Sequence, residues 1–292
     1  MPAASEALAY QQLLSDSRRT VFWALDDQQP WQLEAGGAPV ADGGDWFFLV
    51  NFPRTGSTAA AEILDLHPEI CCGNEQQVLP LLMTILHSRL LLAPELAGSV
   101  RYTKQLPVTA ATVRALMDAW RSCVSGKRLF GDKGEMYHQR FGEPCAAIFP
   151  GCRFVLTVRH PLDALSSYVR QPWALYLRFD GHEAFQQALR RRAREMLTAN
   201  AAWRERAAVI EFEALATEAG FRATFARVLA HLGADPAAFD WDAGWARCRH
   251  AGAIGRGRGD EELEEFMRWL EPRDGELHEA LARGAYYLEA AA

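Results

Sequence analysis

The stretch FFLVNFPRTGSTAAAEILDLHPEI, residues 47–70, decides the fold of this chain. It begins as an apolar run of the length of a buried strand and continues from Ser57 with the periodicity of a helix. PRTGST joins the two parts. A glycine-containing turn between a strand and a helix points backbone N–H groups at one spot, where the helix dipole adds positive potential. The stretch therefore predicts an anion-binding joint between a strand and a helix.

Short apolar runs separated by helix-period segments recur along the rest of the chain. They predict strands at 46–52, 69–73, 128–131, 152–158 and 207–212. The predicted helices are 57–66, 78–92, 112–124, 161–169, 182–203, 221–232, 260–270 and 275–289. Strands of this kind favour a mainly parallel sheet with both faces covered. The predicted fold class is α/β, doubly wound.

The polar motifs of interest stand where the predicted strands end. PRTGST follows the first strand, Asn74-Glu75 the second, Asp132-Lys133 the third, and RHPLD, beginning at Arg159, the fourth. In open α/β sheets, ligands bind beyond the carboxyl ends of the strands. We therefore expect these four motifs to meet in one crevice.

Composition limits the classes of function. Hydrophobic residues make up 49% of the chain and charged residues 23%, as in a soluble globular protein. We expect one domain over residues 1–292, with 1–45 as an N-terminal extension to which the sequence assigns no role. The formal charge of −6 argues against a nucleic-acid partner. No signal-peptide pattern and no apolar run of about 18 residues occurs, so we expect a cytoplasmic protein without a membrane anchor.

The six cysteines show no C-x-x-C spacing and no histidine cluster beside them. This pattern argues against a zinc site and against a disulfide framework. We predict buried free thiols and no metal ligands.

The loop lacks the lysine of nucleoside triphosphatases, whose motif is G-x-x-x-x-G-K-[ST]. Asn51 stands at the place of the first glycine and Ser57 at the place of the lysine, while a basic residue, Arg54, lies inside the loop. This arrangement suits a mono-anionic sulfuryl group beside a single 5′-phosphate, without a metal ion. The alternative is a plain turn in which Gly56 bends the chain and Ser57 caps the helix.

Several motifs resemble those of sulfotransferases that use 3′-phosphoadenosine 5′-phosphosulfate (PAPS). PRTGST is similar to their 5′-phosphosulfate loop, P-[RK]-[ST]-G-[ST]-T, and RHPLDALSS, 159–167, to their 3′-phosphate motif, R-[ND]-P-x-D-x-x-x-S. GDK, 131–133, resembles bacterial members, and LDLHPEICCGNEQQVLP, 64–80, is similar to the tyrosylprotein sulfotransferase stretch that holds the catalytic glutamate. The resemblance spans residues 46–170 and implies a P-loop-type three-layer fold with a central parallel sheet flanked by helices.

The chain departs from the family pattern at a few positions. Ser57 replaces a threonine, His160 replaces Asn or Asp, and Asn74 replaces a second acid. The family's Y-E-D-L stretch is represented only by FEAL, 212–215. These departures weaken any transfer of acceptor identity.

The resemblance implies roles for residues at both ends of the nucleotide. The 5′-phosphosulfate would be held by a group from the loop: Arg54, Thr55, Gly56, Ser57 and Thr58. Lys133 would act with Arg54 on the leaving oxygen; a surface ion pair with Asp132 or Glu135 is its alternative. The 3′-phosphate would be held by Arg159 and Ser167.

A late glycine-rich segment, AGAIGRGRGD, also resembles a family element, the C-terminal loop around the 3′-phosphate. Arg256, Gly257 and Arg258 are its candidate binding residues. A flexible linker is an equally good interpretation of this composition.

Glu75 is the predicted general base, because it follows the second strand and a partly buried carboxylate can accept a hydroxyl proton. A helix N-terminal acid is the alternative. His67 competes for the role, although His67-Pro68 is typical of a helix end, and His138 is a further candidate.

The resulting prediction is sulfuryl transfer from PAPS, with 3′,5′-ADP as product, to a hydroxyl or amine of a small-molecule acceptor. An ATP-using P-loop kinase is one alternative, and the missing Gly-Lys pair argues against it. A non-catalytic nucleotide-binding protein is the other, and the joint presence of Glu75 and Lys133 argues against it. RRRAR, 190–194, is predicted to be a solvated helix face.

Overall fold

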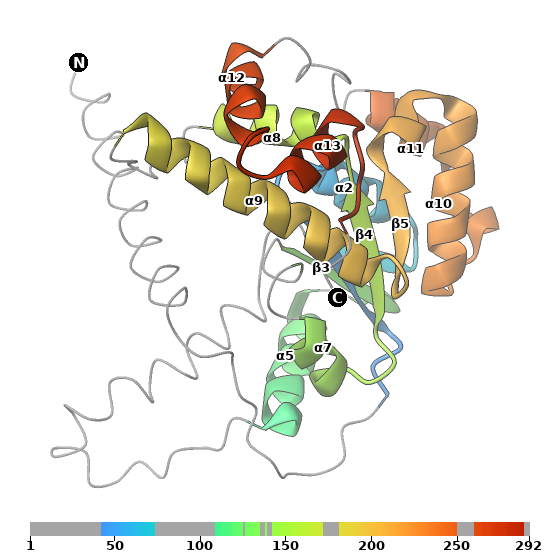
Figure 1. Ribbon diagram of the computed structural model, residues 1–292. Helices are drawn as coiled ribbons and strands as arrows, with labels where there is room; N and C mark the ends of the chain where they lie inside the picture. The colour runs from blue at the N-terminus through green and yellow to red at the C-terminus, as the bar shows by residue number, and fades with distance from the viewer. Residues whose placement is uncertain are drawn as a thin grey trace, which may run out of the picture.

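The structure is a computed structural model that describes residues 42–73, 109–124, 126–134, 138, 142–171, 181–249 and 260–288. Its centre is a five-stranded sheet in the order β2-β3-β1-β4-β5, with every neighbouring pair parallel (Figure 1). The strands are β1 Trp46–Asn51, β2 Ile70–Gly73, β3 Leu129–Gly134, β4 Arg153–Val158 and β5 Ala207–Glu211. This arrangement confirms the predicted α/β class.

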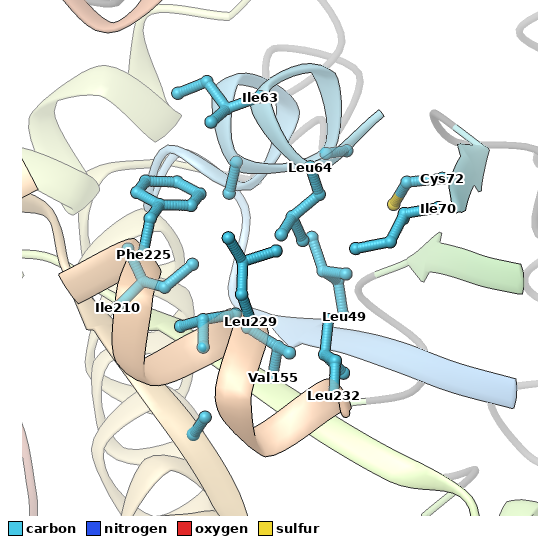
Figure 2. Close-up of a cluster of buried hydrophobic side chains, with 14 of the residues drawn as sticks. Leu49, Ile63, Leu64, Ile70, Cys72, Val155, Ile210, Phe225, Leu229 and Leu232 are labelled. Atoms are coloured by element: carbon cyan, nitrogen blue, oxygen red, sulfur yellow. The ribbon is translucent and has the colours of Figure 1, made fainter. Parts of the chain in front are cut away.

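The central strand β1 packs on both faces because its residues from Trp46 to Val50 are apolar without interruption. Phe47 and Leu49 point to one face, where α2 (Ser57–Leu64) and α10 (Glu218–Leu232) cover the sheet. Figure 2 shows Leu49 in this cluster with side chains of both helices. Trp46 and Phe48 point to the other face. That face is covered by α5 (Ala110–Val124), α7 (Gly142–Ile148) and the end of α9 (His182–Trp203). Helices on both faces fix the sheet as the middle of three layers.

A further apolar cluster joins helices next to the carboxyl end of β4. It contains residues of α8 (Pro161–Val169), α9, α12 (Glu261–Leu270) and α13 (Gly275–Ala282). The red helices α12 and α13 lie against α8 and α9 in Figure 1. The other described elements are α11 (Trp241–Arg249) and the short helices η2 (Phe212–Ala216) and η3 (Pro236–Ala238).

The bounds of α8 and α9 agree with the prediction, whereas β3 is longer than predicted. β3 was expected to end at residue 131, but its pairing with β1 continues through Leu49↔Lys133. Asp132 and Lys133 therefore belong to the strand and do not follow it. The last helix is shorter than the predicted 275–289, because Gly284 takes a left-handed φ of 70° just after its end. The predicted helix 78–92 lies outside the described residues.

The prediction of six buried thiols was wrong for three of the cysteines. Cys72, Cys145 and Cys248 are buried, but Cys71 and Cys152 are half-buried and Cys123 is exposed. Within the described ranges, no group of three or more His, Cys, Asp or Glu side chains could hold a metal ion.

RRRAR, predicted to be a solvated helix face, contains two partly exposed arginines that also form ion pairs. Arg190 Nε lies 2.8 Å and Arg194 Nη2 2.6 Å from the carboxylate of Asp274, which caps α13. These contacts attach α13 to α9. None of the described helices is long and apolar enough to cross a membrane.

Candidate functional site

The loop after β1 is fastened to the end of β4 by a buried hydroxyl. The Thr55 hydroxyl donates to the Phe52 carbonyl at 2.8 Å and accepts from the Thr157 hydroxyl on β4 at 2.7 Å. Thr55 is 1% exposed. Its side chain therefore shapes the loop.

Two residues of the loop have positive φ angles, which turn the backbone toward the start of α2. Arg54 has φ 71° and Gly56 φ 90°. A Cβ on Gly56 would lie 2.3 Å from Cδ2 of Phe212, so only glycine fits there. Gly56 is the N-cap of α2 and contributes no side-chain hydrogen bond to it. The first N–H groups of α2 lack intrahelical partners, as at any helix start, which suits an anion.

The two predicted phosphate motifs meet at this loop. Arg54 Nε donates to Ser167 Oγ on α8 at 3.0 Å. Arg159, which follows β4, donates from Nη1 to the Arg54 carbonyl at 3.3 Å. Residues more than a hundred positions apart are thus brought into direct contact at the carboxyl ends of β1 and β4.

Lys133 enters the same region from β3. Its register opposite Leu49 directs the side chain to the α2 face, where Nζ donates to Thr58 Oγ1 at 2.8 Å. Lys133 is only 2% exposed, so the alternative of a surface ion pair was wrong. Asp132 accepts a 2.9 Å hydrogen bond from the Lys133 backbone N–H.

The two candidate histidines are engaged in structural contacts. His67 Nε2 lies 2.9 Å from the Asp235 carbonyl, and its Nδ1 accepts from the Glu69 N–H at 3.1 Å. Both ring nitrogens of His67 are therefore occupied. His138 is buried, and burial lowers its pKa to about 4 despite a 2.8 Å hydrogen bond to Asn200. A group with that pKa is a weak base near neutral pH.

Phe212 and Glu213 are site residues that sequence reasoning missed. The Arg159 guanidinium carbon lies 4.9 Å from the Phe212 ring centroid, a cation–π distance. Glu213 accepts from the His160 N–H at 2.8 Å. Both residues follow β5 directly, so the strand-end rule that selected the other four motifs would also have selected this one.

The site thus collects three cationic side chains, from Arg54, Lys133 and Arg159, in a chain whose formal charge is −6. Such a cluster can bind more than one anionic group. Four of the predicted site residues lie outside the described residues: Glu75, Arg256, Gly257 and Arg258.

Comparisons with solved structures return sulfotransferase domains. The chain is similar to the sulfotransferase domain from the curacin biosynthetic pathway, with 17% identity, a TM-score of 0.49 and coverage of 86% of this chain and 100% of that one. The sulfotransferase domain from the Synechococcus PCC 7002 olefin synthase is 20% identical, with a TM-score of 0.43 and coverage of 90% of this chain and 94% of that one. A sulfotransferase from Alicyclobacillus acidocaldarius is 16% identical, with a TM-score of 0.39 and coverage of 84% of this chain and 97% of that one.

The comparison with sequence families matches a large part of the chain. No curated protein matches the chain. The profile of the sulfotransferase family matches residues 47–238, which are 192 of the 292 residues and include every described strand from Phe47 onward. The chain therefore belongs to the sulfotransferase family.

Proposed function

We propose that this protein transfers a sulfuryl group from PAPS to a hydroxyl, or an amine, of a small-molecule acceptor. The observation that supports the proposal most is the direct contact of Arg54 with Ser167 and with Arg159 beside the start of α2. It places an arginine from each of two motifs, a serine and a helix N-terminus within one small region.

The residues present fit a nucleotide with two separate anionic ends. Arg159 and Ser167 would hold the 3′-phosphate through charge-assisted and hydroxyl hydrogen bonds. The 5′ end would be held by Arg54 and by the N–H groups at Gly56, Ser57 and Thr58. Gly56 supports this assignment, because its missing side chain keeps the turn compact against Phe212.

Lys133 and Arg54 would supply the electrostatic part of catalysis. When bound, the donor offers a sulfuryl group whose departure leaves negative charge on the bridging oxygen of the nucleotide. Lys133 is buried and held by Thr58, so its charge is in place before the reaction begins. Preorganised charge of this kind lowers a barrier because nothing has to reorient during the chemical step.

Glu75 remains the proposed base. β2 ends at Gly73, which pairs with Asp132, the neighbour of Lys133. The chain therefore leaves β2 beside the lysine, and Glu75 follows two residues later. The occupied nitrogens of His67 and the low pKa of His138 support a carboxylate in this role.

The proposed 3′-phosphate segment, Arg256 to Arg258, is supported by the residue that follows it in the described chain. Asp260 accepts from Ser166 at 2.6 Å and from Arg170 at 2.7 Å, both at or next to α8. Ser166 is adjacent to Ser167. Asp260, two residues after Arg258, is thus bonded to the helix that carries the proposed phosphate serine.

Ligand-induced stabilisation tests the proposal. At about 100 times its Kd, 3′,5′-ADP should raise the free energy of unfolding by about 2.7 kcal/mol, and ATP with Mg²⁺ by much less. Arg159→Ala should lose most of this gain, whereas Arg191→Ala, on the exposed side of α9, should keep it. Sulfated product should then be detected by mass spectrometry with PAPS and hydroxylated acceptors. Greater stabilisation by ATP than by 3′,5′-ADP would favour the kinase instead.

A further inference from the structure

The Glu213 carboxylate connects two segments that are distant in sequence. Its Oε1 accepts from the His160 N–H at 2.8 Å, and its Oε2 accepts from the Tyr286 hydroxyl at 2.9 Å. His160 stands at the N-terminus of α8, and Tyr286 lies after α13. One side chain of η2 therefore holds the start of α8 and the C-terminal segment together.

The C-terminal segment also packs directly on the His160 side chain. Gly284 has φ 70°, and a Cβ at this position would lie 2.4 Å from His160 Nε2. The turn is fixed to α13 by the Ala285 N–H, which donates to the Ala280 carbonyl at 2.9 Å. The histidine that replaces the usual Asn or Asp fits because position 284 carries no side chain.

These contacts converge on Arg159. Its backbone continues into His160, whose N–H is held by Glu213, and its guanidinium lies over Phe212. Phe212 and Glu213 are consecutive residues of η2. Both the main chain and the side chain of Arg159 thus rest on the same short helix.

The hydroxyl of Tyr286 is a dependable donor in this arrangement. Burial, and then the hydrogen bond to Glu213, raise the pKa of Tyr286 above its usual value. The phenol therefore stays protonated throughout the neutral range.

We propose that Glu213, Tyr286 and Gly284 are positioning residues that set Arg159 for the 3′-phosphate, so that the turn 284–286 tunes selectivity for 3′-phosphorylated nucleotides. This inference rests on the proposed function, because it assumes that Arg159 meets that phosphate. The family profile ends at residue 238, so two of the three residues lie beyond the matched region.

Two nucleotides that differ only in the 3′-phosphate, 3′,5′-ADP and 5′-AMP, provide the test. Tyr286→Phe keeps the ring and removes the hydroxyl, so the Kd for 3′,5′-ADP should rise about 5- to 10-fold while the Kd for 5′-AMP stays unchanged. Glu213→Gln should act in the same direction. Tyr287→Phe, at the neighbouring tyrosine, is the matched control and should change neither value.

The outcomes separate this inference from the proposed function. If Arg159→Ala weakens 3′,5′-ADP selectively but Tyr286→Phe and Glu213→Gln do not, the positioning role is wrong and the proposed function stands. If Arg159→Ala weakens both nucleotides equally, the assignment of the 3′-phosphate to Arg159 is itself wrong. Equal weakening of both nucleotides by Tyr286→Phe would show a general structural role and would also overturn the inference.

Discussion

Arg54 stands out among single residues because it is the only described residue other than glycine with a positive φ. The left-handed region costs an L-amino acid roughly 1–2 kcal/mol, and such strain is typical of functional sites. The strain is accepted here because the turn directs the guanidinium to Ser167 and leaves the carbonyl facing Arg159.

Two substitutions at this position separate backbone strain from the side chain. Arg54→Gly and Arg54→Ala both remove the guanidinium, but only glycine relieves the strain. We expect Arg54→Gly to be the more stable of the two by about 1 kcal/mol, since the greater freedom of glycine in the unfolded chain offsets part of the relief. Urea denaturation measures the difference. Equal stabilities would mean that the loop backbone is not strained.

At the scale of elements, each C-terminal helix is attached through the aspartate that caps it. Burial alone would raise the pKa of Asp274, but its hydrogen bonds from Arg190 and Arg194 outweigh burial and lower the pKa. The carboxylate therefore serves twice, as the N-cap of α13 and as the ionic attachment to α9.

Asn and Ala at this position distinguish the two roles of Asp274. Asn caps a helix about as well as Asp, so Asp274→Asn should remove only the ionic attachment. We expect a loss of about 1 kcal/mol, because both arginines are partly exposed and can be hydrated. Asp274→Ala should lose about 1 kcal/mol more, the usual worth of an N-cap. The free energies of unfolding in urea test this order, and equal losses would contradict it.

The elements that sequence reasoning found are those with clear local signals. α8 begins at Pro161, a residue favoured at the first helical position, and α9 follows Gly181. α7 was missed because GEPCAAI is short and combines a glycine with a proline. α11 was overlooked, although Trp241, Trp245 and Cys248 recur at helical spacing and pack against the core. The last residues of β3 were missed because the strand was predicted from an apolar run, which ends before the charged residue Asp132. The pairing of β3 with β1 continues past this residue.

The candidate site also contains a part that the sequence predicts and a part that it does not. The strand-end rule selected Arg54, Lys133 and Arg159, which lie at the carboxyl ends of β1, β3 and β4 along one edge of the sheet. The contacts of Glu213 with His160 and Tyr286 depend on how α8 and the C-terminal segment pack. No local pattern encodes that packing, so these contacts could not be predicted, although the strand-end rule would have selected Glu213 itself.

At the scale of the whole molecule, His138 connects the region after β3 to the C-terminal segment. Asn200 donates from Nδ2 to the Tyr286 carbonyl at 2.9 Å and faces His138 Nε2 with its oxygen. His138 therefore carries its proton on Nε2. The Trp203 indole N–H donates to the His138 carbonyl at 2.9 Å, which completes the buried network.

This buried histidine predicts a stability that depends on pH. Its pKa is about 4 in the folded chain, against roughly 6.5 when unfolded, so its contribution is complete above the unfolded value and is lost as the pH falls toward 4. Between pH 7 and pH 5 the loss should be about 2 kcal/mol. His138→Gln can still donate to Asn200 but does not titrate, so urea denaturation should show a smaller pH dependence. The same slope in both proteins would remove His138 as the cause.

The Arg54–Ser167 hydrogen bond directly joins the residues proposed to hold the two anionic ends of the donor. A phosphate that draws the Ser167 hydroxyl toward itself releases the Arg54 guanidinium for the opposite half. Fragments that each occupy one half would then bind with positive thermodynamic linkage, each tightening the other by the same factor. A whole nucleotide carries both anionic groups in one molecule, so this coupling would add to its binding affinity.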